Sequence, residues 1–148
     1  MKLKKKELLA KTNQLKGEFN EYLAKKYYQN QGYRVIKSVR NEYPFGWKLN
    51  IAELETFLPS NVSKFLIGSF SDDLKGLPDF ICYKEEDLIF VECKSSEENV
   101  RVEQWEKLTL LAALGFDVRL WITKVQLECS HSNTEVNFLG GENDAANA

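Results

Sequence analysis

The sequence predicts one α/β domain in which a β-hairpin near the middle of the chain lies between two helices. Two apolar, β-prone runs, residues 80–83 and 88–91, flank four polar residues, a pattern typical of a hairpin. Apolar residues at steps of three and four predict amphipathic helices over residues 4–30 and 101–114. A strand with period-two alternation follows over residues 116–122, and a right-handed crossover would place it beside the hairpin. We therefore expect a mixed sheet flanked by helices.

The 148 residues carry a net charge of −2, which argues against a nucleic-acid binder that is basic over its whole surface. The charge is uneven, because residues 1–26 hold eight lysines against three glutamates, whereas residues 125–148 hold four acidic residues and no lysine or arginine. A basic N-terminal helix fits local contact with phosphates, and a merely solubilising charged end is the alternative. The nucleic-acid-binding candidates on this helix are Lys11, Lys16, Lys25 and Lys26.

Cysteine usage and hydropathy indicate the compartment. Three cysteines, an odd number without the spacing of a metal site, are typical of a reduced intracellular protein. No run of 18 apolar residues exists, and the lysine-rich start lacks the apolar core of a signal peptide. We therefore expect a soluble, cytoplasmic protein with no membrane partner.

The hairpin register predicts a cluster of charged side chains. If the turn is centred between Glu85 and Glu86, Asp79 lies directly across from Glu92, and cross-strand partners have Cβ atoms roughly 4.5–5.5 Å apart. Lys94 is two residues beyond Glu92, so the strand period places it on the same face. Isolated charges beside an apolar strand would be costly, which favours a functional site. The alternative is an ordinary hairpin with a Glu–Lys pair on a solvated edge.

Two carboxylates and a lysine suit divalent-metal chemistry. Mg²⁺ is usually held by one or two carboxylates together with waters and substrate phosphate oxygens. A metal bound by Asp79 and Glu92 would polarise a phosphodiester and lower the pKa of a bound water. Lys94 could orient that water, help deprotonate it, or stabilise charge that develops on the phosphate oxygens.

The segments around these residues resemble a known superfamily. Gly-Leu-Pro-Asp-Phe at residues 76–80, followed after a short turn by Phe-Val-Glu-Cys-Lys at residues 90–94, is similar to the PD-(D/E)xK nucleases. The spacing is most similar to the VRR-NUC and archaeal Holliday-junction-resolvase branches, and the resemblance covers residues 17–122. It implies a restriction-endonuclease-like αβββαβ core and a metal-dependent endonuclease. It also implies Mg²⁺ or Mn²⁺ bound by Asp79, Glu92 and the backbone carbonyl of Cys93, with Lys94 acting on the attacking water.

Two further residues are candidates through the same resemblance. The first helix of these nucleases often carries an active-site glutamate, and Glu18 lies on the border of the predicted apolar stripe formed by residues such as Leu15 and Phe19. Glu21 is the rival, but it points further from that stripe. Gln104, near the start of the second long helix, resembles a glutamine near the metal site. Ordinary surface roles are the alternatives for Glu18 and Gln104.

Residues 40–75 form an insertion between the first strand, residues 32–39, and the catalytic hairpin. It contains an aromatic loop over residues 43–47, a short helix over residues 51–58 and a segment, residues 64–70, that could be a strand. Long insertions are commonly functional, so a role in shaping the substrate site is one interpretation. Packing of Phe45 and Trp47 into the core is the alternative that we favour.

The C-terminal part of the chain is polar from residue 129 onwards. Gly, Asn, Asp and Ala dominate its end, which predicts a disordered tail over residues 129–148. His131 stands alone there and is expected to be a surface residue. The predicted nuclease-like domain therefore spans residues 1–128.

These observations lead to a DNA nuclease dependent on Mg²⁺ or Mn²⁺, and two alternatives stay open. One is a DNA-binding module of the same fold that no longer cuts, against which the intact Asp79, Glu92 and Lys94 argue. The other is a homodimeric, structure-specific Holliday junction resolvase. Such a dimer would need an exposed apolar patch, which Phe45, Trp47 or Trp121 could supply.

Overall fold

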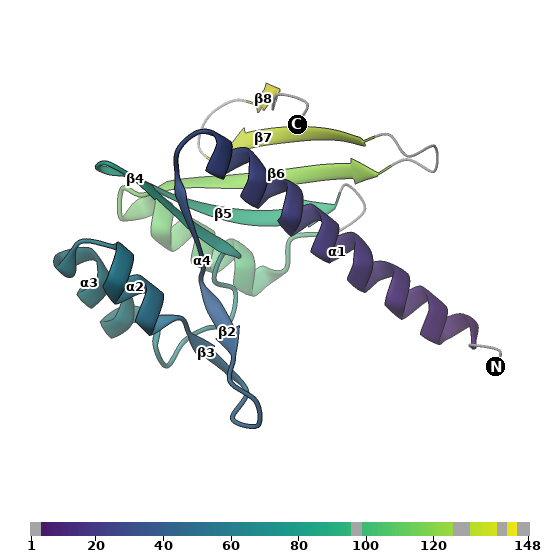
Figure 1. Cartoon of the computed structure of the whole chain (residues 1–148), viewed down its shortest axis with the longest axis horizontal. Helices are drawn as coiled ribbons and strands as arrows, with labels where there is room; N and C mark the ends of the chain where they lie inside the picture. The colour runs from purple at the N-terminus through teal and green to yellow at the C-terminus, as the bar shows by residue number, and fades with distance from the viewer. Residues whose placement is uncertain (1–3, 96–98, 126–130, 139–141, 145–148) are drawn as a thin grey trace.

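The computed structural model describes residues 4–95, 99–125, 131–138 and 142–144 (Figure 1). The helices are α1 (Lys5–Asn30), α2 (Ile51–Phe57), α3 (Ser60–Phe70) and α4 (Val102–Ala113). The strands are β1 (Arg34–Lys37), β2 (Val39–Asn41), β3 (Trp47–Leu49), β4 (Phe80–Lys84), β5 (Asp87–Ser95), β6 (Asp117–Val125), β7 (His131–Asn137) and β8 (Glu142–Asp144). None of the helices in these ranges is long and apolar enough to span a membrane.

A mixed six-stranded sheet forms the centre of the fold, in the order β1-β4-β5-β6-β7-β8. All neighbouring strands are antiparallel except β5 and β6, which are parallel and are joined through α4. Strands β2 and β3 pair separately as a small two-stranded sheet. The predicted α/β class with a mixed sheet flanked by helices is therefore confirmed.

Each face of the sheet is covered by different helices. Figure 1 shows α1 crossing one face while α4 lies behind the other. On the α1 side the buried residues are Leu23, Ala24, Tyr28, Phe80, Cys82, Ile89, Val91, Cys93 and Trp121. On the other side α2, α3 and α4 contribute Leu54, Leu66, Phe70, Leu108 and Leu111, which pack against Ile36, Ile81, Phe90 and Val118 of the sheet. Burial of these apolar side chains is the main stabilising contribution to the fold.

The buried face of α1 differs from the predicted stripe. Leu15, Phe19 and Tyr22 are exposed, and the buried positions of the helix are Asn20, Leu23, Ala24 and Tyr28. Figure 1 shows the reason, because the N-terminal half of α1 extends past the ends of the strands and has no sheet beneath it. Only the second half of the helix packs against the sheet, through these four residues.

Part of the 40–75 insertion was predicted wrongly. Residues 64–70 belong to helix α3 and not to a strand, and Ser63, Leu66 and Phe70 are buried at steps of three and four. A short apolar run cannot be assigned to helix or strand by periodicity alone. The short helix before Pro59 is confirmed as α2.

Phe45 and Trp47 do not pack into the core, so that prediction is wrong. Both side chains are exposed, at or next to the tip of the β2–β3 hairpin. Figure 1 shows this hairpin projecting away from the main sheet. Leu49, at the base of the hairpin, is the residue of β3 that is buried.

The expectation of a disordered tail from residue 129 is also wrong for the described part of that segment. β7 pairs with β6 from Arg119↔Asn137 to Val125↔His131, and β8 pairs with β7. Two polar residues of β7, Asn133 and Glu135, are buried and hydrogen-bonded. Tyr28 donates its hydroxyl hydrogen to Glu135 Oε2 at 2.6 Å, and Arg119 donates to Glu135 Oε1 at 2.8 Å. The sheet therefore continues beyond the predicted boundary at residue 128.

Candidate active site

The β4–β5 hairpin has the predicted register. Phe80 pairs with Val91 and Lys84 with Asp87, which leaves a two-residue turn. Asp79 is the residue before β4, and the same register places it opposite Glu92. The Cys93 backbone N–H donates to Asp79 Oδ2 at 2.8 Å, which fixes the carboxylate against β5.

Three charged or polar side chains meet at the end of this hairpin. Glu92 and Lys94 are both buried, and Lys94 Nζ lies 3.8 Å from Glu92 Oε1. Gln104, buried in the first turn of α4, donates from Nε2 to the same Oε1 at 2.9 Å. Its own Oε1 accepts from the Arg101 backbone N–H at 2.9 Å, so the amide is held in one orientation. The structure thus brings Gln104 to the pair that the hairpin register predicted.

One carboxylate oxygen at this site has no partner. Glu92 is 2% exposed, and its Oε2 is buried without a hydrogen-bond partner among the described residues. A buried carboxylate oxygen without a donor is costly, so such an atom requires an explanation. A proton, a water or a cation would satisfy it.

The electrostatics favour a cation at this position. Burial raises the pKa of Glu92, the charge of Asp79 raises it further, and Lys94 acts in the opposite sense. Burial also raises the pKa of Asp79 to about 6, although the hydrogen bond from the Cys93 N–H lowers it. Two carboxyl groups that are desolvated and repel each other resist ionisation. A divalent cation between them would offset both the desolvation of the two carboxylates and their mutual repulsion.

The site opens into a hollow of about 330 Å³ between the hairpin, α1 and α4. Asp79, Glu92, Cys93, Lys94 and Gln104 line one side of the hollow. The lining residues from α1 are Asn13, Gln14, Gly17, Glu18, Asn20 and Glu21. All the predicted catalytic residues therefore border one hollow.

The two glutamates of α1 contribute differently. Glu18 is exposed and accepts a hydrogen bond from Gln14 at 3.2 Å. Glu21 is half-buried, lies 3.6 Å from Lys37, and contributes to the raised pKa of Asp79. Glu21 was expected to lie further from the buried face because the apolar stripe over Leu15 and Phe19, which is exposed, was taken as the packed face. On the face that actually packs, Glu21 is nearer to the buried Asn20 and Ala24 than Glu18 is.

Asn20 is a residue that sequence reasoning missed. It lines the hollow, its side chain is almost completely buried, and its Oδ1 has no hydrogen-bond partner among the described residues. An asparagine between apolar neighbours on a packed helix face is unusual. Asn20 therefore stands out as a candidate, but only when the packed face of α1 is known.

Glycine 76 fixes the loop that carries Asp79. Its φ is +83°, and a Cβ added there would lie 2.2 Å from the Glu103 carbonyl oxygen and 3.0 Å from the Gln104 nitrogen. The loop backbone therefore packs directly on the first turn of α4, at a distance that only glycine permits. This contact fixes the position of the loop that carries Asp79 relative to the helix turn that carries Gln104.

The predicted DNA-binding lysines all lie on α1. Lys11, Lys25 and Lys26 are exposed and Lys16 is half-buried. A second hollow of about 330 Å³ shares Glu18 and Glu21 with the active-site hollow, and its lining includes Lys25. Lys25 thus lines a hollow that shares two residues with the active-site hollow.

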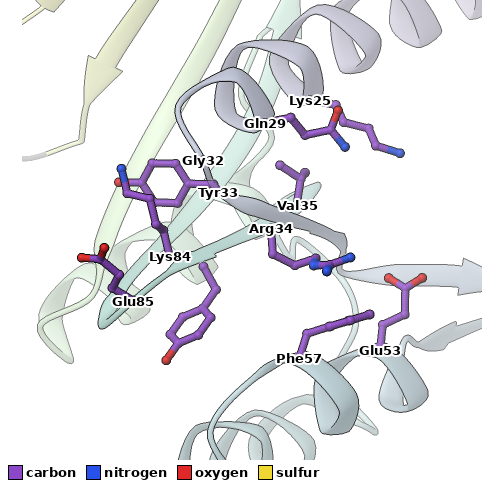
Figure 2. A pocket seen from close by; sticks show the side chains of 11 residues that line it. Lys25, Gln29, Gly32, Tyr33, Arg34, Val35, Glu53, Phe57, Lys84 and Glu85 are labelled. Atoms are coloured by element: carbon purple, nitrogen blue, oxygen red, sulfur yellow. The ribbon is translucent and has the colours of Figure 1, made fainter.

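Another hollow, of about 850 Å³, lies over β1 and is lined by neither Asp79 nor Glu92 (Figure 2). It shares Lys25, Val35 and Glu53 with the second hollow, so the two are neighbours on the surface. Its wall contains two cation–aromatic contacts: the Arg34 guanidinium is 4.1 Å from the Phe57 ring centroid and Lys84 Nζ is 4.6 Å from that of Tyr33. This hollow lacks a carboxylate pair like that of the active site and is better suited to contact than to catalysis.

The donor set fits Mg²⁺ or Mn²⁺. Asp79 and Glu92 supply two carboxylates, and the Cys93 backbone lies between Glu92 and Lys94 on the same strand. No group of three or more His, Cys, Asp and Glu that could hold a metal occurs within the described ranges. Mg²⁺ does not require one, because waters and substrate phosphates complete its octahedron. Coordination by the Cys93 carbonyl stays a prediction.

Comparison with protein-family models, with curated proteins and with solved structures finds no match for this chain. A functional assignment must therefore come from the residues and geometry of the site.

Proposed function

We propose that this chain is a metal-dependent nuclease that hydrolyses phosphodiester bonds in DNA, with Mg²⁺ or Mn²⁺ held by Asp79 and Glu92. The observation that carries the proposal is the buried, unpartnered Oε2 of Glu92 beside a second desolvated carboxylate. Removing a carboxylate from water without a partner costs free energy. A bound cation offsets it and supplies the chemistry.

The order of elements supports a restriction-endonuclease-like core. α1, β1, β4, β5, α4 and β6 follow one another along the chain as αβββαβ, with the first three strands antiparallel and the fourth parallel to the third. β2, β3, α2 and α3 are then an insertion after the first core strand. β7 and β8 extend the sheet beyond the core.

Each side chain of the site has a role in this proposal. The metal, when bound, would polarise a phosphodiester oxygen and lower the pKa of a water. Gln104 holds Oε1 of Glu92, which leaves Oε2 available as a ligand. Lys94, 3.8 Å from the same carboxylate, balances part of its charge and is placed to orient water or to donate to a phosphate oxygen. Glu18 and Glu21 add negative charge at the entrance of the site.

A cleavage assay tests the proposal. Labelled junction, flap, duplex and single-stranded DNA are incubated with Mg²⁺, with Mn²⁺ and with chelator. We expect metal-dependent cleavage that Glu92→Gln abolishes. Glu86→Gln, which removes an exposed charge in the turn of the same hairpin, should leave cleavage unchanged. Absence of cleavage on all four substrates with either metal would contradict the proposal, as would cleavage by Glu92→Gln at the parental rate. DNA binding without any cleavage would instead support the non-cleaving alternative.

The basic face of α1 is proposed to contact DNA phosphates. Binding should weaken as salt rises, because each neutralised phosphate releases counterions and adds about 0.7–0.9 to the slope of log K against log salt. Alanine at Lys11, Lys16, Lys25 and Lys26 should flatten this slope. A control with alanine at Lys64, Lys75 and Lys124, exposed lysines outside α1, should not. An unchanged slope in the α1 variant would show that DNA binds elsewhere.

The homodimeric resolvase is the less favoured form of this proposal. It requires a self-association surface, and Trp121 is buried in the core and cannot contribute to one. Phe45 and Trp47 are exposed, and sedimentation of the purified chain would reveal a dimer built on them.

A further inference from the structure

The tip of the β2–β3 hairpin exposes three aromatic side chains. Tyr43 is 89%, Phe45 is 77% and Trp47 is 57% exposed, within five consecutive residues of one narrow turn. Exposing this much aromatic surface forfeits the free energy that its burial would contribute. A hairpin that only connects β1 to α2 would not require these residues.

Two basic residues lie on the strands of the hairpin, next to its aromatic tip. Arg40 pairs with Lys48, and Asn41 pairs with Trp47 one position further along, so the two basic residues lie on the face opposite Trp47. Both basic residues are exposed. Aromatic rings with nearby positive charge match the two chemical features of a nucleic-acid strand, the flat base and the phosphate.

The base of the hairpin is attached to the active site. The Ser38 N–H donates to the Asp79 carbonyl oxygen at 3.0 Å, and the Asn50 N–H donates to the Ser38 carbonyl oxygen at 2.9 Å. Phe45 is seven residues after Ser38, so at about 3.3 Å per residue the tip lies within roughly 25 Å of Asp79. That corresponds to about seven base steps at the ~3.4 Å spacing of duplex DNA.

We propose that Tyr43, Phe45 and Trp47 stack on the bases of an unpaired DNA strand, so that the enzyme prefers DNA containing a single-stranded segment near the scissile bond. This inference rests on the proposed nuclease function and specifies its substrate class. In duplex DNA the base faces are already stacked on one another, and an exposed ring gains contact only with bases that are free. Arg40 and Lys48, on the other face of this thin ribbon, would contact phosphates where the same strand passes around its edge.

A second copy of the chain is a less suitable occupant. A stable protein interface buries about 800 Å² on each partner. Three aromatic side chains of about 150–250 Å² each, exposed to the fractions given above, provide less than that. They also surround the tip of a thin ribbon, whereas a self-association surface is normally a broad patch.

The test measures binding of the full chain in chelator, where no cleavage occurs, to a single-stranded oligonucleotide, a flap and a blunt duplex. The triple variant Tyr43→Ala, Phe45→Ala, Trp47→Ala should lose at least about tenfold in affinity for the first two, since it removes the rings on which bases would stack. Its affinity for the blunt duplex should change less than twofold. Trp105→Ala, which removes an exposed tryptophan on α4, is the matched control and should bind all three substrates normally.

A strand of abasic sugar-phosphate separates stacking from charge. The parental chain should bind it as weakly as the triple variant binds normal single strand. Alanine at Arg40 and Lys48 should lower the salt slope without removing the preference for bases. Far-ultraviolet circular dichroism of the triple variant should match that of the parent, because the substituted side chains lie outside the core.

Three results would overturn the inference: unchanged binding of single strand, an equal loss for duplex, or a parental dimer that the triple variant dissociates while DNA binding persists. Failure of the nuclease proposal is distinguishable from these. In that case base-dependent binding is lost in the triple variant, yet the parental chain cuts no substrate with Mg²⁺ or Mn²⁺. If the parental chain cleaves DNA and the triple variant keeps the same substrate preference, the nuclease proposal holds and the stacking inference fails.

Discussion

Replacing Asp79 by asparagine should make the stability of the protein less dependent on pH. Burial is the largest cause that raises the pKa of Asp79, from 3.8 to about 6, and the charge of Glu21 adds to it. A carboxyl group with a raised pKa in the folded state favours folding below its unfolded pKa, near 4. That contribution is lost as the pH rises through about 6.

The magnitude follows from the shift. One pKa unit corresponds to 1.36 kcal/mol, so ionising Asp79 costs roughly 3 kcal/mol of unfolding free energy between pH 4 and pH 8. For a chain of this size 1 kcal/mol is about 2–4 °C in Tm, which gives a loss of roughly 6–12 °C. Glu92, whose pKa is raised to about 9, extends the loss to higher pH.

Thermal unfolding in chelator between pH 4 and pH 9 measures the effect. The asparagine still accepts the Cys93 N–H, does not ionise, and removes the negative neighbour of Glu92. Asp79→Asn should therefore match the parent at pH 4 and exceed its stability by about 3 kcal/mol at pH 8. Asp72→Asn, at an exposed aspartate, should follow the parental curve. A stability difference between Asp79→Asn and the parent that stays constant with pH would refute the reasoning.

Three further substitutions have defined outcomes. Gly76→Ala should cost at least about 2 kcal/mol of unfolding free energy in a urea titration and should lower cleavage, because the new Cβ meets the α4 backbone at a positive φ. Gly68→Ala, whose new Cβ has no neighbour within 4 Å, should be neutral or stabilising in the same titration. Tyr28→Phe should cost about 1–3 kcal/mol by removing the hydrogen bond to Glu135, with no change in cleavage rate; an unchanged urea midpoint would show that β7 is not held by this contact. Mg²⁺ at 100 times its Kd should stabilise the parent by about 2.7 kcal/mol in a thermal shift. Glu92→Gln should lose that gain, and an equal gain in this variant would place the metal elsewhere.

The hairpin and its charged residues could be predicted from sequence because their arrangement is local. The β4–β5 register follows from a short turn and the strand period, and it is sufficient to place Asp79 opposite Glu92 and Lys94 on the same side as Glu92. The hairpin register could not identify Gln104 as a site residue, which was predicted only from the resemblance to a nuclease superfamily. Its hydrogen bond to Glu92 crosses from α4 to β5.

The parts that were predicted wrongly depend on distant partners. Which face of α1 packs is decided by where the sheet ends beneath it, so the apolar stripe over its first half was misleading. Residues 129–148 were predicted to be disordered because they are polar. Within β7, the groups that hydrogen-bond the buried Glu135, Tyr28 and Arg119, are 107 and 16 residues away in sequence. The exposure of Phe45 and Trp47 could not be predicted from apolar character, since function can retain an aromatic residue on the surface.

The central claim is that one hollow both holds a divalent metal and cleaves DNA, and Lys94→Ala separates these two roles. The decisive measurement is the Mn²⁺-dependent cleavage rate of this variant, at Mn²⁺ concentrations shown by calorimetry to saturate it. Lys107→Ala, which removes a second buried lysine outside the hollow, is the matched control. We predict that Lys94→Ala binds Mn²⁺ at least as tightly as the parent, because one positive charge has left the site. Its cleavage rate should fall about 10²–10⁴-fold while Lys107→Ala still cuts. Cleavage by Lys94→Ala at the parental rate would contradict the account.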